Sequence, residues 1–64
     1  MQEEILLTVT QTARILQVSE RTVVNYITRG ELPAFRVGLR GYRISPSDLQ
    51  AFIEKRKHPP DKDL

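Results

Sequence analysis

Arginine is the residue type in this sequence whose chemistry and spacing point to a binding function. Residues 21–43 carry five arginines against one acid, Glu31, which gives this segment a net charge of +4. The guanidinium group is a planar fork that can donate two parallel hydrogen bonds to a phosphate or to the edge of a guanine, whereas lysine offers only a point charge. A solvated basic surface is the alternative explanation, and the elements that carry the arginines must decide between the two. These residues are Arg21, Arg29, Arg36, Arg40 and Arg43.

The remaining composition argues against catalysis and against insertion into a membrane. The 64 residues contain no cysteine and one histidine, His58, which precedes two prolines. We therefore expect no disulfide, no cysteine-based zinc site and no catalytic group built around this histidine. No apolar run approaches the roughly 18 residues that a membrane-spanning helix needs, and the N-terminus is acidic where a signal peptide is basic. The sequence predicts a small cytoplasmic protein that is not an enzyme, uses no cofactor, metal or small-molecule ligand and does not bind a membrane.

A first short helix is predicted after Thr8. Gln11 follows three residues later, and the pair has the sequence of a capping box. We expect a helix of about eight residues whose apolar positions recur at helical spacing. The residues of this stripe are Val9, Thr12, Ala13 and Leu16, with Ile15 beside it.

A second short helix, of about ten residues, is predicted between Ser19 as its N-cap and Gly30 as its stop. Glu20 in the first turn suits the helix dipole, and Pro33 prevents a restart. The apolar stripe is narrow and consists of Val23, Tyr26 and Ile27. Two short helices joined by about three residues are typical of a helix-turn-helix.

Residues 34–44 predict a β-hairpin, because apolar and polar residues alternate on both sides of a turn with a glycine at each end. A turn of four residues, 38–41, sets the expected register. The side chains expected on the inner face are Phe35, Val37, Tyr42 and Ile44. We expect Arg36 and Arg43 to point outward and Arg40 to lie at the tip.

A third helix is predicted from Ser45 as the cap and Pro46 at the first helical position. Its apolar stripe is Leu49, Phe52 and Ile53. The fold class is therefore mainly α with a small β-hairpin, a winged helix-turn-helix in the order helix, helix, hairpin (the wing), helix. We expect residues 1–6 to form a flexible arm, residues 7–57 the domain and residues 58–64 a disordered tail.

The outward positions of the second helix are short and polar, as a helix that approaches base edges requires. Arg21 is placed to bind a guanine through O6 and N7, Asn25 could bind an adenine or a phosphate, and Val24 could contact a thymine methyl group. Ser19 and Thr22 could donate to phosphates near the helix N-terminus. A solvated surface, with Arg21 paired to a nearby acid, is the alternative. The full candidate set is Ser19, Glu20, Arg21, Thr22, Val24, Asn25 and Thr28.

The hairpin would supply a second contact. Arg40 is flanked by Gly41 and stands near Gly38, so the tip could lie close to a phosphate or enter a minor groove. Arg36 and Arg43 would contact the sugar-phosphate chain. The alternative is a charged hairpin that discourages edge-to-edge aggregation.

Taken together, the motifs resemble the excisionase-type DNA-binding domain, a family of small winged helices related to the head of the MerR regulators. The resemblance covers residues 7–53 and rests on order and spacing, since no single motif is specific. The matching motifs are Leu7-Thr8, Ala13, Leu16, Val18-Ser19, Arg21-Thr22-Val23, Ile27, Gly30-Glu31-Leu32-Pro33, Phe35-Arg36-Val37-Gly38, Tyr42-Arg43-Ile44 and Asp48-Leu49. Leu39-Arg40 departs from the more glycine- and basic-rich wing tip often seen in the family. Gln17 also departs from the pattern, because the family usually has glycine there. If the position needs a positive φ, glutamine costs roughly 1 kcal/mol.

The resemblance implies that the domain binds double-stranded DNA, with the second helix in the major groove and the wing in the adjacent minor groove. By position it assigns Arg21, Thr22 and Asn25 to the helix and Arg36, Arg40 and Arg43 to the wing. Two roles are usual in the family: an excisionase, or recombination directionality factor, that bends DNA beside integrase sites, and a small transcriptional regulator. We favour the first, because the domain fills nearly the whole sequence. Its partners would then be a site-specific integrase and further copies bound side by side. A protein-interaction module is the lesser alternative.

Overall fold

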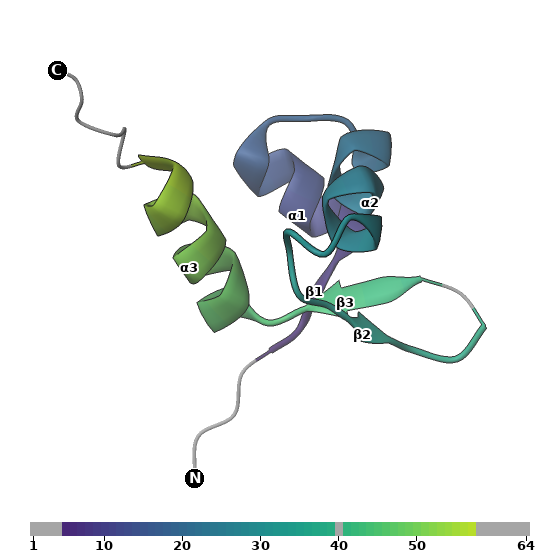
Figure 1. Ribbon diagram of the computed structural model, residues 1–64. Coiled ribbons are helices and arrows are strands. Elements are labelled where there is room, and N and C mark those ends of the chain that lie inside the picture. Colours follow the sequence, from purple (N-terminus) through teal and green to yellow (C-terminus); the bar gives the residue numbers. More distant parts are fainter. Residues whose placement is uncertain (1–4, 40, 58–64) are drawn as a thin grey trace, which may run out of the picture.

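The computed structural model describes residues 5–39 and 41–57 and has three helices and a small antiparallel sheet. In chain order the elements are β1 (Leu7–Thr8), α1 (Val9–Leu16), α2 (Glu20–Thr28), β2 (Phe35–Arg36), β3 (Tyr42–Ile44) and α3 (Pro46–Lys57). Helices α1 and α2 lie above the sheet, α3 lies to one side, and the β2–β3 hairpin extends away from the helices on the other side (Figure 1). The predicted class, a mainly α winged helix-turn-helix, is confirmed.

The start of α1 confirms the predicted capping box. The N–H of Gln11 donates to Thr8 Oγ1 at 3.0 Å, and the N–H of Thr8 donates to Gln11 Oε1 at 2.9 Å. Thr8 also belongs to β1, a strand that the sequence did not predict, and it pairs with Arg43 of β3. The cap therefore ties the first helix to the sheet, with β3 between β1 and β2.

The turn between the two helices depends on Gln17. This residue has a φ of 59°, in the left-handed region, and its N–H points to the carbonyls of Ala13 and Arg14. The next N–H, of Val18, donates to the Ala13 carbonyl at 3.0 Å. These bonds satisfy the last carbonyls of α1 and redirect the chain into α2. The position does require the conformation that glycine adopts more cheaply than glutamine.

Helix α2 begins and ends where the sequence predicts. Ser19 Oγ accepts the N–H of Thr22 at 3.1 Å. At the other end Gly30 has a φ of 77°, and the N–H of Glu31 donates to the Tyr26 carbonyl at 2.8 Å. This is the pattern of a Schellman motif, which reverses the chain direction. The reversal carries Leu32, which is 1% exposed, into the core.

The register of the hairpin differs from the prediction. Phe35 pairs with Arg43 and Arg36 pairs with Tyr42, while the N–H of Val37 donates to the Gly41 carbonyl at 3.3 Å. The turn between Val37 and Gly41 therefore contains three residues, whereas the predicted turn, 38–41, contained four. Because side chains alternate between the faces of a strand, this slip of one residue moves Phe35 and Val37 to the other face.

Two predictions about the hairpin are consequently wrong. Phe35 and Val37 do not join the core; they are 53% and 43% exposed. Arg36 and Arg43 do not share a face, because Arg36 lies on the side of Tyr42 and Arg43 on the side of Phe35. The physical reason is the shorter turn, in which Gly41 at a φ of 80° pairs with Val37.

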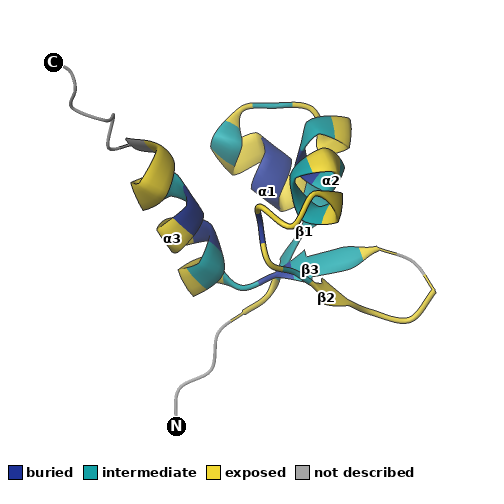
Figure 2. Cartoon of the chain, in the orientation of Figure 1, coloured by how far each residue is buried: buried dark blue, intermediate teal, exposed yellow. Residues whose placement is uncertain are grey.

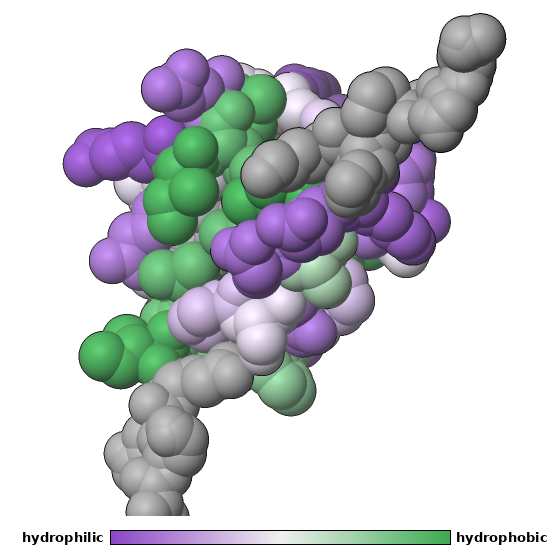
Figure 3. All heavy atoms as spheres, turned by 90° about the vertical axis from the view of Figure 1, so that its left-hand side faces the viewer, coloured by the Kyte–Doolittle hydropathy of each residue, from purple (hydrophilic) through white to green (hydrophobic). Residues whose placement is uncertain are grey.

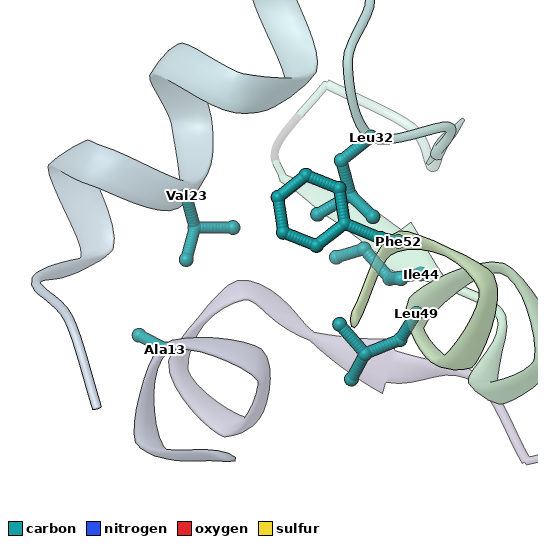
Figure 4. Close-up of a cluster of buried hydrophobic side chains, with 6 residues drawn as sticks. All are labelled: Ala13, Val23, Leu32, Ile44, Leu49 and Phe52. Carbon is teal, nitrogen blue, oxygen red and sulfur yellow. The ribbon is translucent and has the colours of Figure 1, made fainter. Parts of the chain in front are cut away.

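A small hydrophobic core joins all three helices to the sheet. Its buried side chains converge from the three helices, the turn after α2 and strand β3 (Figure 4). They are Ala13, Val23, Leu32, Ile44, Leu49 and Phe52. Partly buried residues pack around them, including the predicted Tyr26, Ile27 and Ile53. The buried segments face the centre of the molecule, whereas the outer side of α2 and the hairpin is largely exposed or half-buried (Figure 2). The narrow stripe of α2 is thus sufficient to hold the helix.

Helix α3 is held by its predicted stripe and by Arg56. Ser45 Oγ accepts the N–H of Asp48 at 3.3 Å, which caps the helix. The Arg56 guanidinium lies 4.7 Å from the centre of the Phe52 ring and 5.0 Å from that of Tyr26. Arg56 Nη2 also donates to Glu31 Oε1 at 2.9 Å. These contacts join the last turn of α3 to the turn after α2.

Candidate nucleic-acid interface

The exposed side of α2 presents Arg21 and Asn25 one helical turn apart. Both side chains are exposed, and among residues 5–39 and 41–57 neither takes part in an ion pair or a side-chain hydrogen bond. Within the described part of the chain, Arg21 therefore does not pair with an acid, as the alternative explanation required. Two hydrogen-bonding groups of this kind are available to a ligand that follows the helix surface.

Ser19 and Thr22 form a hydroxyl pair at the N-terminus of α2. Their oxygens lie 2.9 Å apart, and Ser19 Oγ also accepts the N–H of Thr22. One hydroxyl hydrogen fills the bond between the two side chains, so the other remains able to donate to an external acceptor. The pair leaves one hydroxyl donor beside the positive end of the helix dipole, where an anion is favoured.

The other candidates on α2 have structural contacts. Glu20 Oε2 accepts a hydrogen bond from Thr10 Oγ1 at 3.0 Å, which joins the first turn of α2 to the first turn of α1. Thr28 Oγ1 donates to the Asn25 carbonyl at 3.2 Å, so this hydroxyl hydrogen is already used. Val24 is half-buried. Sequence reasoning did not find the role of Thr10, because the partners are ten residues apart and no local pattern joins them.

Not every arginine of residues 21–43 is free to bind a ligand. Arg29 Nη1 lies 3.5 Å from Glu31 Oε2, and the other oxygen of this carboxylate accepts the bond from Arg56. Glu31 thus bridges the end of α2 and the last turn of α3. Such exposed ion pairs contribute little stability by themselves, but they direct Arg29 toward α3 and away from the outer side of α2.

The wing arginines lie on opposite faces of the hairpin. Arg36 is exposed, and its guanidinium lies 5.4 Å from the centre of the Tyr42 ring, on the face that carries buried Ile44 at the other end of β3. Arg43 is half-buried on the outer face, and its Nη1 donates to the Tyr42 carbonyl at 3.0 Å. Arg40 lies outside the described residues. The predicted wing cluster is therefore divided between two faces.

The side of the molecule opposite the wing has a different character. Figure 3 shows this side, where hydrophilic side chains lie beside a band of hydrophobic ones. An open groove of about 660 Å³ lies between the Gly30–Pro33 turn and α3, and its charged lining residues are of both signs. They are Glu31, Asp48, Glu54 and Lys55. This mixture does not form a basic surface, which leaves α2 and the wing as the candidate interface.

Two further observations concern the described residues as a whole. No group of three or more histidine, cysteine, aspartate or glutamate side chains within residues 5–39 and 41–57 is arranged to hold a metal ion. No helix in this part of the chain is long and apolar enough to cross a membrane.

Two short helices with an exposed polar side on the second, followed by a hairpin and a third helix, define a protein of the winged helix-turn-helix class. Comparison of the sequence agrees: the helix-turn-helix domain family matches residues 6–57, and the chain belongs to this family. Two proteins from two strains of Mycobacterium tuberculosis, each named "Putative DNA-binding protein", are 41% identical to the chain over 49 residues. The match covers 77% of this chain and 62% of each relative. No solved structure is significantly similar to the chain.

Proposed function

We propose that the protein binds double-stranded DNA in a sequence-specific manner, with α2 in the major groove and the hairpin in the adjacent minor groove. The observation that carries the proposal is the pair Arg21 and Asn25, which is exposed on α2 and free of side-chain partners among the described residues. Membership of the helix-turn-helix family and the names of the two mycobacterial relatives support it.

The side chains of α2 have distinct roles in this proposal. Arg21 binds O6 and N7 of a guanine, and Asn25, one turn further, binds an adenine or a phosphate. The free hydroxyl hydrogen of the Ser19 and Thr22 pair binds a phosphate at the helix N-terminus. Glu20 acts indirectly, because its bond to Thr10 sets how α2 sits on α1. Val24 and Thr28 present methyl groups to the groove wall.

The wing arginines contact the two DNA strands separately. A minor groove is bordered by one sugar-phosphate chain on each side. Because Arg36 and Arg43 lie on opposite faces of the hairpin, an inserted wing directs one of them to each border. Arg40, whose structure is not described, is proposed as a further contact to the groove on the basis of its place in the turn.

Within DNA binding, we propose the role of an excisionase, which binds and bends DNA next to the sites of an integrase in a prokaryotic cell or mobile element. The resemblance of residues 7–53 to the excisionase-type domain supports this role. One such module buries only roughly 600–1,000 Å² of protein surface on DNA, so side-by-side copies or an integrase would supply the remaining affinity. A small transcriptional regulator is the alternative role.

Selection from a random library of DNA duplexes tests the proposal. We expect one preferred sequence, and a binding constant that falls steeply with salt because each neutralised phosphate contributes close to one unit to the log–log slope. A protein that binds no duplex even at low salt would contradict the proposal. An excision assay with the integrase encoded nearest the gene then separates the two roles, because a transcriptional regulator leaves excision unchanged.

A further inference from the structure

Leu39 is the most exposed large hydrophobic side chain in the described part of the protein. Its exposed fraction is 95%, against 80% for Ile5 near the N-terminus and 54% for Ile15 of α1. It belongs to the turn between β2 and β3, and this hairpin extends away from α3 (Figure 1). The side chain makes no contribution to the core, so packing within the domain does not explain a leucine here.

Leu39 stands at the tip of the hairpin, between Gly38 and Gly41 in the sequence. Gly38, which precedes it, has a φ of 60°, and a Cβ at that position would meet no atom within 4 Å beyond its chain neighbours. Gly41 closes the turn by pairing with Val37. Gly38 and Gly41 add no side chain of their own to the turn, so the backbone at these two positions can approach a ligand closely.

Behind Leu39, one face of the hairpin carries exposed apolar side chains, and both faces carry an arginine. Phe35 and Val37 are exposed on the outer face, where Arg43 also lies, and Arg36 lies on the inner face. An exposed leucine ahead of two arginines matches how minor-groove proteins deform DNA: cations hold the borders of the groove, and an apolar side chain enters between base pairs.

We propose that Leu39 is a wedge that inserts between two neighbouring base pairs from the minor groove, unstacks them and kinks the duplex toward the major groove. The proposal rests on the proposed function, and it names the residue that bends the DNA. Burial of the leucine side chain between bases offsets the lost stacking, and the arginines on the two faces hold the groove while it opens.

The wedge also predicts a sequence preference at a position where no hydrogen bond is made. TA and CA/TG steps unstack most easily, so such a step should recur at a fixed distance from the bases bound by α2. This preference should depend on Leu39 and be independent of Arg21.

The experiment uses the full chain and a duplex obtained by selection, with 2-aminopurine placed at the preferred step and a dye at each end. The fluorescence of 2-aminopurine reports unstacking, and energy transfer between the dyes reports the bend. The variants are Leu39→Ala, which removes the wedge, Leu39→Phe, which keeps an apolar wedge, and Ile15→Ala, which removes an exposed apolar side chain from α1. Because these side chains are largely exposed, all three variants should fold, which circular dichroism checks.

We expect the wild type to bend the duplex by about 20–90° and to raise the 2-aminopurine signal. Leu39→Ala should lose most of the bend, most of the 2-aminopurine signal and the preference for the flexible step. Its affinity for the duplex should change less than about tenfold, because the free-energy cost of unstacking disappears together with the wedge. Leu39→Phe and Ile15→Ala should both bend the duplex as the wild type does.

A Leu39→Ala variant that binds with the wild-type bend would overturn the wedge and leave the proposed function intact. The wedge would also be overturned if Leu39→Ala abolished self-association of the free protein in sedimentation experiments and had no effect on the bend, since the tip would then contact a second copy. If the wild type bound no duplex, the proposed function and the wedge would fail together.

Discussion

Phe35 of β2 lies opposite Arg43 of β3, and this pairing places Arg36 and Arg43 on opposite faces of the hairpin. The relationship determines how the wing can contact a duplex. A wing with both arginines on one face could neutralise phosphates of one strand, whereas this wing can contact both borders of a minor groove.

The first prediction concerns these two arginines. Arg36→Ala and Arg43→Ala should each lower the log–log salt slope of DNA binding by about one, and the double variant by about two. Phosphate-ethylation interference shows which phosphates must be unmodified for binding. DNA binding by Arg36→Ala should become insensitive to ethylation at a phosphate of one strand, and DNA binding by Arg43→Ala at a phosphate of the other strand. Arg29→Ala is the matched control, because Arg29 pairs with Glu31, and it should leave the slope unchanged. Insensitivity on the same strand in both variants would refute the divided wing.

The second prediction concerns base recognition by α2. Replacing Arg21 with alanine should weaken binding by about 1–3 kcal/mol and relax the preference at one base pair, because a bidentate hydrogen bond to guanine is removed. Selection experiments on the variant and the wild type measure both effects. Since Arg21 has no ion-pair partner within the described residues, its removal should leave the melting temperature nearly unchanged. An unaltered preferred sequence would mean that α2 does not lie in the groove as proposed.

The third prediction separates the two roles of Ser19, which caps α2 and lies beside the proposed phosphate. Ser19→Ala should lower the free energy of unfolding by about 0.5–2 kcal/mol, because the N–H of Thr22 loses its acceptor. Ser19→Asp should keep the stability, since aspartate is a good N-cap, but should weaken DNA binding through repulsion of the phosphate. Chemical denaturation and binding titrations at two salt concentrations distinguish the effects. Unchanged DNA affinity in Ser19→Asp would place the helix N-terminus outside the interface.

The fourth prediction concerns the strained turn between the helices. Gln17 has a φ of 59°, so Gln17→Gly should raise the free energy of unfolding by about 1 kcal/mol. For a domain of this size that corresponds to an increase in Tm of about 4–8 °C. Gln17→Ala is the control, because alanine keeps the unfavourable φ and should bring no gain. A glycine variant no more stable than the alanine variant would show that the left-handed conformation is not costly here.

Local signals in the sequence predicted much of the fold. The capping box of Thr8 and Gln11, the Ser19 cap and the stop at Gly30 each depend on residues within about four positions, and the structure confirms all three. The apolar stripes follow the period of a helix and therefore show which side packs inward. The candidate side of α2 could be predicted for the same reason.

Other features could not be predicted, because they depend on residues far apart in the chain. Strand β1 has two residues, Leu7 and Thr8, and is recognisable only when β3 pairs with it. The bridge from Glu31 to Arg56 joins positions 25 residues apart. The bond between Thr10 and Glu20 likewise requires that α1 and α2 already be packed together.

The sequence by itself determined where the helices begin and end and which of their sides face the core, because both follow from near neighbours in the chain. It also determined that arginine is concentrated in residues 21–43, which is a matter of composition. Only the tertiary structure decided how those arginines are distributed. The shorter hairpin turn placed Arg36 and Arg43 on opposite faces, the bridge through Glu31 removed Arg29 from the candidate interface, and the projecting turn left Leu39 in solvent. The physical reason is that a strand exchanges its faces with a shift of one residue, so its register is set by pairing and core packing rather than by any local pattern.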